Sequence, residues 1–191
     1  MRIDPRRACS YRPPAPFSLG GEIVKYGKLG PYKGETYGSV MESYIIAPLC
    51  ESPIEIRFGS RLSESLRQSA EIFFGFGYAI LPYGETFKFP RSFLVLSPQF
   101  KLSGFRYDFA VHISSEETPE LLIECDGKDF HSSVEQKRND LRKDDAASAK
   151  SIKMLRFTGS EIYQSVDWCV AQALVPLFEK WRLPSAVRRV F

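Results

Sequence analysis

Acidic residues follow an apolar run in the segment LLIECDGKDFH, residues 121–131. In a strand the side chains alternate between two faces, so Leu122, Glu124 and Asp126 share one side. Charged side chains at the end of a buried strand cost free energy unless they are paired or bind a metal ion. The segment therefore predicts a site at which carboxylates surround a metal ion.

A further aspartate, Asp108, lies in the preceding apolar segment FRYDFAV. Neighbouring antiparallel strands lie about 5 Å apart, so acids on the two strands can reach one cation. Mg²⁺ takes oxygen ligands, usually one or two carboxylates together with water and phosphate oxygens. We therefore expect Asp108, Glu124 and Asp126 to bind Mg²⁺, with Mn²⁺ as a substitute. The alternative for Asp108 is an ion pair with Arg106 or a turn cap.

The polar segment SSVEQKRNDLRKDDAASAKS follows directly and predicts a helix of about five turns. Gln136, Asp140 and Lys143 share one face of that helix, which meets either the acids or solvent. A lysine near the acids can orient water or stabilise negative charge on a phosphate. Lys128 is one candidate, and Gln136, Lys137 or Lys143 are the alternatives from the helix. Lys143 is also a candidate for substrate contact.

Three further residues each have a functional and a structural interpretation. Glu55 follows Ser52 and Pro53 at the start of a predicted helix, where it either acts in the site or completes a capping box. His131 either contacts phosphate and positions water, or packs in the core. Arg156, in MLRFTG, either contacts phosphate or pairs with a carboxylate.

The elements that position these residues follow from the hydrophobic pattern. Apolar residues at spacings of three and four predict an amphipathic helix that begins at Ser52 and ends around Gly75 to Gly77. SFLVLSPQFKL, FRYDFAVHI and ELLIECD predict an antiparallel meander, and IKMLRFTG predicts a later strand. SEIYQSVDWCVAQALVPLFEKW predicts a closing helix with a break near Gln164–Ser165. The order predicts an α/β fold, with a mixed central sheet of about four strands flanked by the leading helix and two C-terminal helices.

Composition and charge limit the class of protein. The 191 residues are 43% hydrophobic and 26% charged, values typical of a soluble globular protein. The net charge of +3 permits nucleic-acid contact, and scattered cysteines favour a reduced, cytoplasmic compartment. The first residues, MRIDPRRACSYRPPAPF, lack an apolar run, so we expect no signal peptide, and we expect no transmembrane helix because no window approaches 18 uninterrupted apolar residues. We expect an irregular arm over residues 1–50, with SVMESYIIAPL as a candidate for one short element, an organised domain that carries the acids over 51–183, and a basic tail over 184–191.

Five segments together resemble the PD-(D/E)XK nuclease superfamily, in the branch near the very-short-patch-repair endonucleases. They occur in order over roughly residues 51 to 170: SPIE, QFKLSGFRYDFAV, LLIECDGKDFH, EQKRNDLRKDD and IKMLRFTGSEI. The resemblance implies a restriction-endonuclease-like fold, in which Asp108 and Glu124 match the metal-binding acids and Glu55 matches the acid of the leading helix. The chain departs from the simple acid–x–lysine motif, because Asp126 occupies the lysine position counted from Glu124.

The same resemblance implies a Mg²⁺-dependent endonuclease that hydrolyses DNA phosphodiester bonds without a covalent enzyme intermediate. Asp126 or Lys128 would position or activate water, and Gln136 would help to orient it. The alternative is a catalytically inactive module on a nuclease fold that binds nucleic acid or another partner. A small-molecule metallohydrolase is less favoured, because a chain with two histidines lacks the His-rich ligand set of zinc hydrolases.

Overall fold

The computed structural model describes residues 37–82, 84–85, 93–113, 118–127 and 134–180, all within one compact unit, Pro31–Phe191. Two predicted site residues, Lys128 and His131, lie outside the described residues. The side chains of Gln136 and Lys137 are also outside them, although their backbone belongs to a described helix. The predicted tail and most of the predicted arm are likewise not described.

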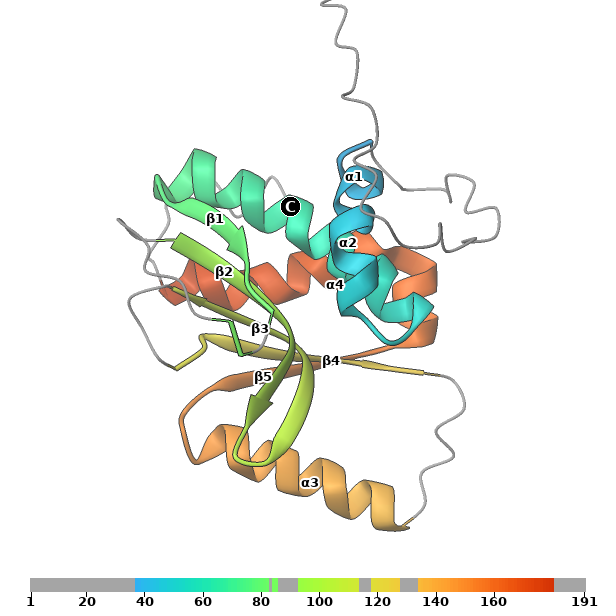
Figure 1. Cartoon of the computed structure of the whole chain (residues 1–191). Coiled ribbons are helices and arrows are strands. Elements are labelled where there is room, and N and C mark those ends of the chain that lie inside the picture. The colour runs from blue at the N-terminus through green and yellow to red at the C-terminus, as the bar shows by residue number, and fades with distance from the viewer. Residues whose placement is uncertain (1–36, 83, 86–92, 114–117, 128–133, 181–191) are drawn as a thin grey trace, which may run out of the picture. The chain divides into compact units, whose positions relative to one another are not determined.

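A mixed sheet of five strands, in the order β1-β2-β3-β4-β5, forms the centre of the fold (Figure 1). The strands are β1 (Gly77–Ile80), β2 (Phe93–Leu102), β3 (Phe105–Ile113), β4 (Leu121–Asp126) and β5 (Lys153–Thr158). Strands β2, β3 and β4 form the predicted antiparallel meander, while β1 and β5 pair in parallel with β2 and β4. The expected α/β class with a mixed sheet is therefore confirmed.

The expectation of about four strands is corrected by β1, which adds a fifth at the edge of the sheet. This strand has four residues, all only partly buried. A segment so short shows no alternating pattern, and its parallel pairing with β2 depends on contacts distant in the chain.

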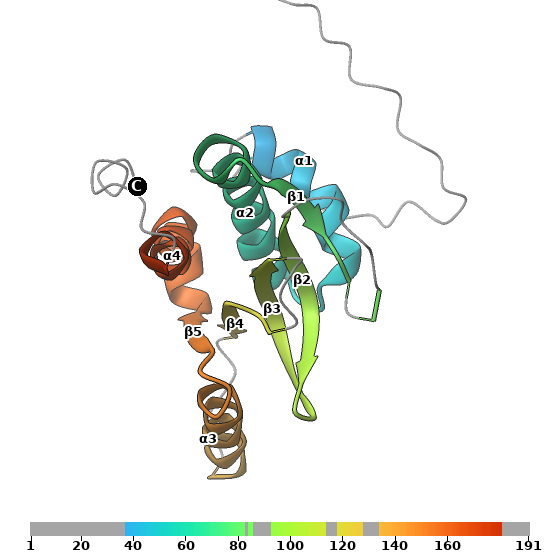
Figure 2. The same cartoon turned by 90° about the vertical axis from the view of Figure 1, so that its left-hand side faces the viewer.

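The helices cover both faces of the sheet. They are α1 (Tyr37–Ile46), followed by a 3₁₀ turn (Ala47–Leu49), α2 (Pro53–Ser69), continued by the π-helical turn η2 (Ala70–Phe74), α3 (Val134–Ser148) and α4 (Gly159–Lys180). Helices α2 and α4 pack on one face and α3 on the other (Figures 1 and 2). The predicted break in the closing helix is confirmed at Ser165, where φ is −157° and ψ is 84°. No described helix is long and apolar enough to cross a membrane.

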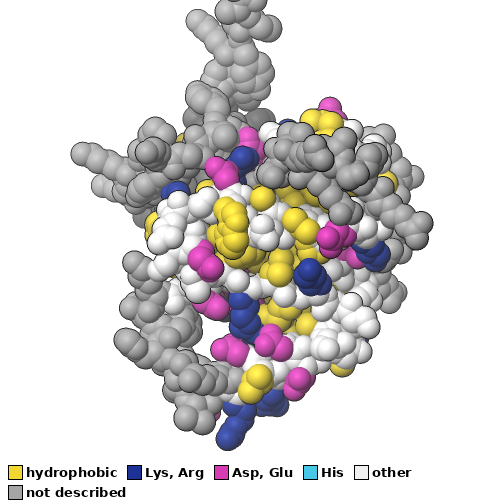
Figure 3. Space-filling view, turned by 180° about the vertical axis from the view of Figure 1, so that it is seen from behind, with side chains coloured by type: hydrophobic (Ala, Val, Ile, Leu, Met, Phe, Trp, Pro, Cys, Tyr) yellow, Lys and Arg dark blue, Asp and Glu magenta, His cyan; other side chains and the backbone are white. Residues whose placement is uncertain are grey.

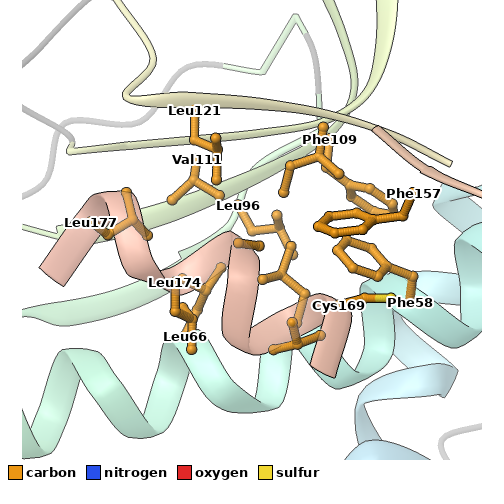
Figure 4. Close-up of a cluster of buried hydrophobic side chains, with 14 of the residues drawn as sticks. Phe58, Leu66, Leu96, Phe109, Val111, Leu121, Phe157, Cys169, Leu174 and Leu177 are labelled. Carbon is orange, nitrogen blue, oxygen red and sulfur yellow. The ribbon is translucent and has the colours of Figure 1, made fainter. Parts of the chain in front are cut away.

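The larger hydrophobic cluster lies between the sheet and helices α2 and α4 (Figure 4). Phe58 of α2 packs there against Phe109 and Phe157, with ring centroids 5.9 Å and 5.3 Å away. Burying each such side chain stabilises the fold by roughly 1.5–3 kcal/mol. A smaller cluster under α3 contains Leu122 and Ala147. Helix α3 is thus attached through few apolar contacts, as its polar sequence predicts.

The hairpin of β2 and β3 changes faces at Gln99. Leu96 packs in the larger cluster, yet Phe100 packs against the smaller one, although regular alternation puts both on the same side. On β3, Phe109 and Tyr107 divide between the clusters in the same way. Gln99 adopts a left-handed conformation with φ of 53°. The part of the hairpin between Gln99 and the turn therefore packs toward the cluster under α3.

Candidate active site

Asp108 lies where β3 and β4 stop pairing with each other. The β3–β4 ladder ends at the pair Phe109–Ile123, whereas β4 stays paired with β5 as far as Asp126. Beyond the ladder, the backbone N–H of Cys125 donates a hydrogen bond to Asp108 Oδ2 at 2.6 Å. The carboxylate therefore replaces a backbone acceptor at the opening between the two strands.

The surroundings of Asp108 disfavour its ionised form. The pKa of Asp108 is raised from 3.8 to about 7, chiefly by burial and further by the negative charges of Glu124 and Glu55. The Cys125 N–H and the ammonium group of Lys143 oppose this rise in pKa. Three acids from α2, β3 and β4 thus interact through their charges, which is an arrangement that a cation would stabilise.

Glu124 forms an ion pair with Lys143 across the space between β4 and α3. Lys143 Nζ lies 2.7 Å from Glu124 Oε1, and the two side chains are 15% and 9% exposed. Burial raises the pKa of Glu124, and the hydrogen bond from Lys143 opposes that shift. Tyr107 braces the pair, since its hydroxyl donates to the Lys143 carbonyl at 3.1 Å and Lys143 Nζ lies 5.5 Å from its ring centroid. Among the alternatives for the site lysine, Lys143 is therefore one that reaches a predicted metal ligand.

Glu55 caps the start of α2 and also interacts with a residue of a distant strand. Its backbone N–H donates to Ser52 Oγ at 3.3 Å, and Ser52 Oγ donates to Glu55 Oε1 at 2.6 Å, which confirms the capping interpretation. The backbone N–H of Glu51 donates to Glu55 Oε2 at 2.9 Å. Gln99 Nε2 donates to the same oxygen at 2.8 Å. The cap therefore holds a buried carboxylate within the electrostatic reach of Asp108.

Asp126 lies in a different electrostatic environment, next to Arg156. Burial raises the pKa of Asp126, and the positive charge of Arg156 opposes the rise. Arg156 donates to Asp140 Oδ1 at 3.2 Å and to Asp144 Oδ1 at 2.9 Å. The carboxylate-pairing interpretation of Arg156 is thus confirmed, and its guanidinium group ties α3 to β5.

Two residues near the site carried no signal in the sequence. Glu51 binds Arg106 through two carboxylate oxygens, at 2.5 Å and 2.6 Å, so Arg106 pairs with Glu51 and not with Asp108. Gln99 contacts Glu55 across 44 positions of sequence. The sequence SPQF does not distinguish Gln99 from any other residue of a strand. Its contact with Glu55 is visible only in the folded structure.

The chemistry of the donor set fits a hard divalent cation. Asp108 and Glu124 offer carboxylate oxygens from adjacent strands, and Mg²⁺ usually takes one or two carboxylates, with water and substrate oxygens completing its coordination. Within the described ranges, no group of three or more His, Cys, Asp or Glu side chains is already arranged to hold a metal. A cation at this position would offset the burial and the like charges that raise the pKa of Asp108.

The surface near α3 carries both signs of charge. Seen from behind, the lower part of the described surface intersperses acidic with basic side chains, below a gathering of hydrophobic side chains (Figure 3). A shallow cavity of about 670 Å³ lies between α3 and β5, lined by residues that include Asp144, Lys153 and Arg156. Neither Asp108 nor Glu124 lines it, so this cavity is separate from the carboxylate cluster.

Comparisons with known proteins identify no relative of this chain. No protein-family model, no curated protein and no solved structure matches the chain. The resemblance stated from the sequence therefore remains an expectation. The positions and the chemistry of Asp108, Glu124 and Lys143 are the basis for a functional proposal.

Proposed function

We propose that the protein is a Mg²⁺-dependent endonuclease that hydrolyses DNA phosphodiester bonds on a restriction-endonuclease-like fold. One observation carries the proposal: Asp108 lies where β3 and β4 part, in electrostatic contact with Glu124, and Lys143 lies 2.7 Å from Glu124. Two carboxylates and an ammonium group suit the hydrolysis of a phosphodiester, because the reaction gathers negative charge at one phosphorus atom. The α/β architecture with a mixed sheet is compatible with this fold.

The proposed roles follow from the position of each group. Asp108 and Glu124 would hold Mg²⁺ or Mn²⁺, with Asp126 as a further ligand. The bound ion supplies polarisation of the phosphate and acidification of water. Lys143 places a positive charge beside the two acids, where it would stabilise the negative charge that develops on the phosphate oxygens. Asp126 or Lys128 would position water, with Gln136 assisting from α3.

The proposed partner is DNA in the cytoplasm. The whole chain has a net charge of only +3, and the face seen from behind mixes both signs of charge around α3. Phosphate contacts would then be few, so the affinity for DNA would depend only weakly on salt concentration. DNA would therefore be selected more by its fit to the acidic site than by long-range electrostatic attraction.

A second candidate is a module that binds nucleic acid or another partner without cutting. Two observations favour it: the Glu124–Lys143 ion pair already neutralises a predicted metal ligand, and the described side chains include no group of three or more candidate metal ligands. Such a module would retain its ligand in EDTA, whereas the endonuclease would need the divalent ion.

The deciding experiment is cleavage of supercoiled, nicked, branched and single-stranded DNA in Mg²⁺, Mn²⁺ or EDTA. Wild-type protein would be compared with Asp108→Asn and Glu124→Gln, and Asp145→Asn would serve as an exposed control on α3. We expect metal-dependent cutting that both site variants lose and the control keeps. Absence of cutting with every metal, together with unchanged DNA binding by both variants, would leave only the second candidate.

A further inference from the structure

Gln99 has an unusual conformation for a residue within a strand. Its φ of 53° lies in the left-handed region, which costs free energy for residues other than glycine and occurs mainly in turns or functional sites. The flanking pairs Pro98–Phe109 and Phe100–Tyr107 place Gln99 opposite Asp108 in the β2–β3 register. The strained residue therefore stands directly across the hairpin from the central acid of the proposed site.

The orientation of the Gln99 amide is determined by its partner. Nε2 lies 2.8 Å from Glu55 Oε2, and an ionised carboxylate can only accept hydrogen bonds, so the nitrogen must face Glu55. The amide oxygen then points elsewhere. Gln99 Oε1 is buried and finds no hydrogen-bond partner among the described residues. A buried acceptor without a donor is destabilising, so both the backbone and the side chain of Gln99 carry a cost.

The chemistry of the site limits which groups can donate a hydrogen bond to Gln99 Oε1. Glu55 and Glu124 supply no donor when ionised, and Asp108 forms no hydrogen bond with Gln99 Oε1. A DNA phosphodiester likewise has only acceptor oxygens at neutral pH, and the ammonium group of Lys143 bonds to Glu124 and not to Gln99 Oε1. Among the described residues no donor reaches this oxygen, whereas water can, and a hydrated Mg²⁺ ion would bring several water molecules into such a site.

We propose that Gln99 is a positioning residue of the site, and this inference rests on the proposed function. Its Nε2 fixes the Glu55 carboxylate in place, while its Oε1 accepts a hydrogen bond from a water molecule held among the acids. The left-handed backbone is retained because it aims the amide at Glu55 from the strand opposite Asp108. Gln99 thereby connects the leading helix to the hydration of the bound ion.

Two substitutions separate this role from a purely structural one. Gln99→Gly relieves the backbone strain, since glycine adopts positive φ freely, but removes the amide. Gln99→Met keeps much of the side-chain volume and removes both hydrogen-bonding atoms. Ser103→Gly is the matched control, because Ser103 also has φ of 53° but is exposed in the turn of the same hairpin.

The experiment measures Mn²⁺ binding by calorimetry without DNA, thermal unfolding in EDTA, and kcat and KM for cleavage of the preferred DNA. We expect both Gln99 variants to bind Mn²⁺ at least about tenfold more weakly and to lose about tenfold in kcat, with KM for DNA unchanged. We expect Gln99→Gly to unfold within about 5 °C of wild type, and Ser103→Gly to match wild type in every measurement.

Each outcome decides the inference. If Gln99→Gly and Gln99→Met fold, bind Mn²⁺ and cut DNA like wild type, Gln99 only bends the hairpin and the inference is overturned while the endonuclease stands. If Gln99→Gly keeps the full activity of wild type and only Gln99→Met is impaired, the site needs the backbone conformation and not the amide. The inference is then also overturned. If wild-type protein neither binds Mn²⁺ nor cuts DNA, the proposed function fails and the inference fails with it.

Discussion

Lys143 of α3 and Glu124 of β4 form an ion pair at 2.7 Å in which both side chains are largely buried. The pair connects a helix that has few apolar contacts to the strand that carries the predicted metal ligand. Removing one member of a buried pair leaves an uncompensated charge and costs about 3–5 kcal/mol, whereas removing both is often nearly neutral. The pair therefore contributes to the attachment of α3 as well as to the charge of the site.

The first prediction concerns Lys143→Met. We expect the free energy of unfolding to fall by roughly 2–3 kcal/mol, because Glu124 loses its partner. We expect cleavage to fall about 100-fold or more, because the positive charge beside the acids is lost. Urea unfolding monitored by circular dichroism gives the first quantity, and a plasmid-cleavage time course gives the second.

The double variant Lys143→Met/Glu124→Gln separates stability from catalysis. Its stability should return to near that of wild type, while its cleavage should stay absent. Lys150→Met, at an exposed lysine just after α3, is the matched control and should change neither property. Full cleavage by Lys143→Met would remove Lys143 from the proposed site.

The second prediction concerns the dependence of stability on pH in EDTA. The folded protein holds a proton on Asp108 up to a pKa of about 7, whereas the unfolded chain releases it near 3.8. The stabilising contribution is therefore complete below pH 3.8 and is lost as pH rises toward 7. At pH 8 in EDTA we expect Asp108→Asn to be more stable than wild type, by on the order of 2 kcal/mol.

Glu124 and Asp126 have raised pKa values as well, so the informative quantity is the difference between wild type and Asp108→Asn at each pH. This difference should grow between pH 4 and pH 7 and then level off. Mg²⁺ should stabilise wild type at pH 8 but not Asp108→Asn. Equal stability of the two proteins at pH 8 would show that Asp108 is not held in the environment described for it.

Most of the fold could be predicted because its signals are local. Ser52 and Glu55 mark the start of α2 through a cap within four residues, and alternating or β-branched segments mark β2, β3 and β4. The break at Ser165 also follows from sequence over a few residues. Strand β1 was missed, because four residues carry too little pattern and its place depends on pairing with β2.

The part of the candidate site that could be predicted is the proximity of acids on adjacent strands. Asp108 and Glu124 approach each other because adjacent antiparallel strands carry them, which strand order and alternation predict. The Lys143–Glu124 and Gln99–Glu55 contacts depend on how α3 and the bent hairpin pack against other elements. A glutamine with positive φ inside a strand has no local signal such as glycine or asparagine, so sequence could not reveal it.

The third prediction concerns Arg156→Met. Because Asp140 and Asp144 already bind the guanidinium group, we expect its loss to affect the docking of α3 rather than contact with DNA. The free energy of unfolding should fall by about 1 kcal/mol, since these carboxylates are half exposed. The slope of log Kd against log salt, measured with Ca²⁺ in place of Mg²⁺, should be unchanged. A slope smaller by about 1 would instead assign Arg156 to a phosphate contact.

The fourth prediction separates the two roles of Glu55. In Glu55→Gln, an amide oxygen can take the place of Oε2 and accept from Glu51 N–H and Gln99 Nε2, while the amide nitrogen donates to Ser52 Oγ. The variant therefore keeps the cap and removes only the charge near Asp108. We expect unchanged or slightly higher stability, and cleavage reduced about tenfold or more.

Ser52→Ala provides the opposite change, since it weakens the cap and keeps the Glu55 charge. It should lower the free energy of unfolding by about 1 kcal/mol and leave cleavage near that of wild type. If Glu55→Gln cuts DNA at the wild-type rate, Glu55 serves only as a cap. If Ser52→Ala loses cleavage as severely as Glu55→Gln while remaining folded, the precise placement of the Glu55 carboxylate, and not its charge alone, is what the reaction requires.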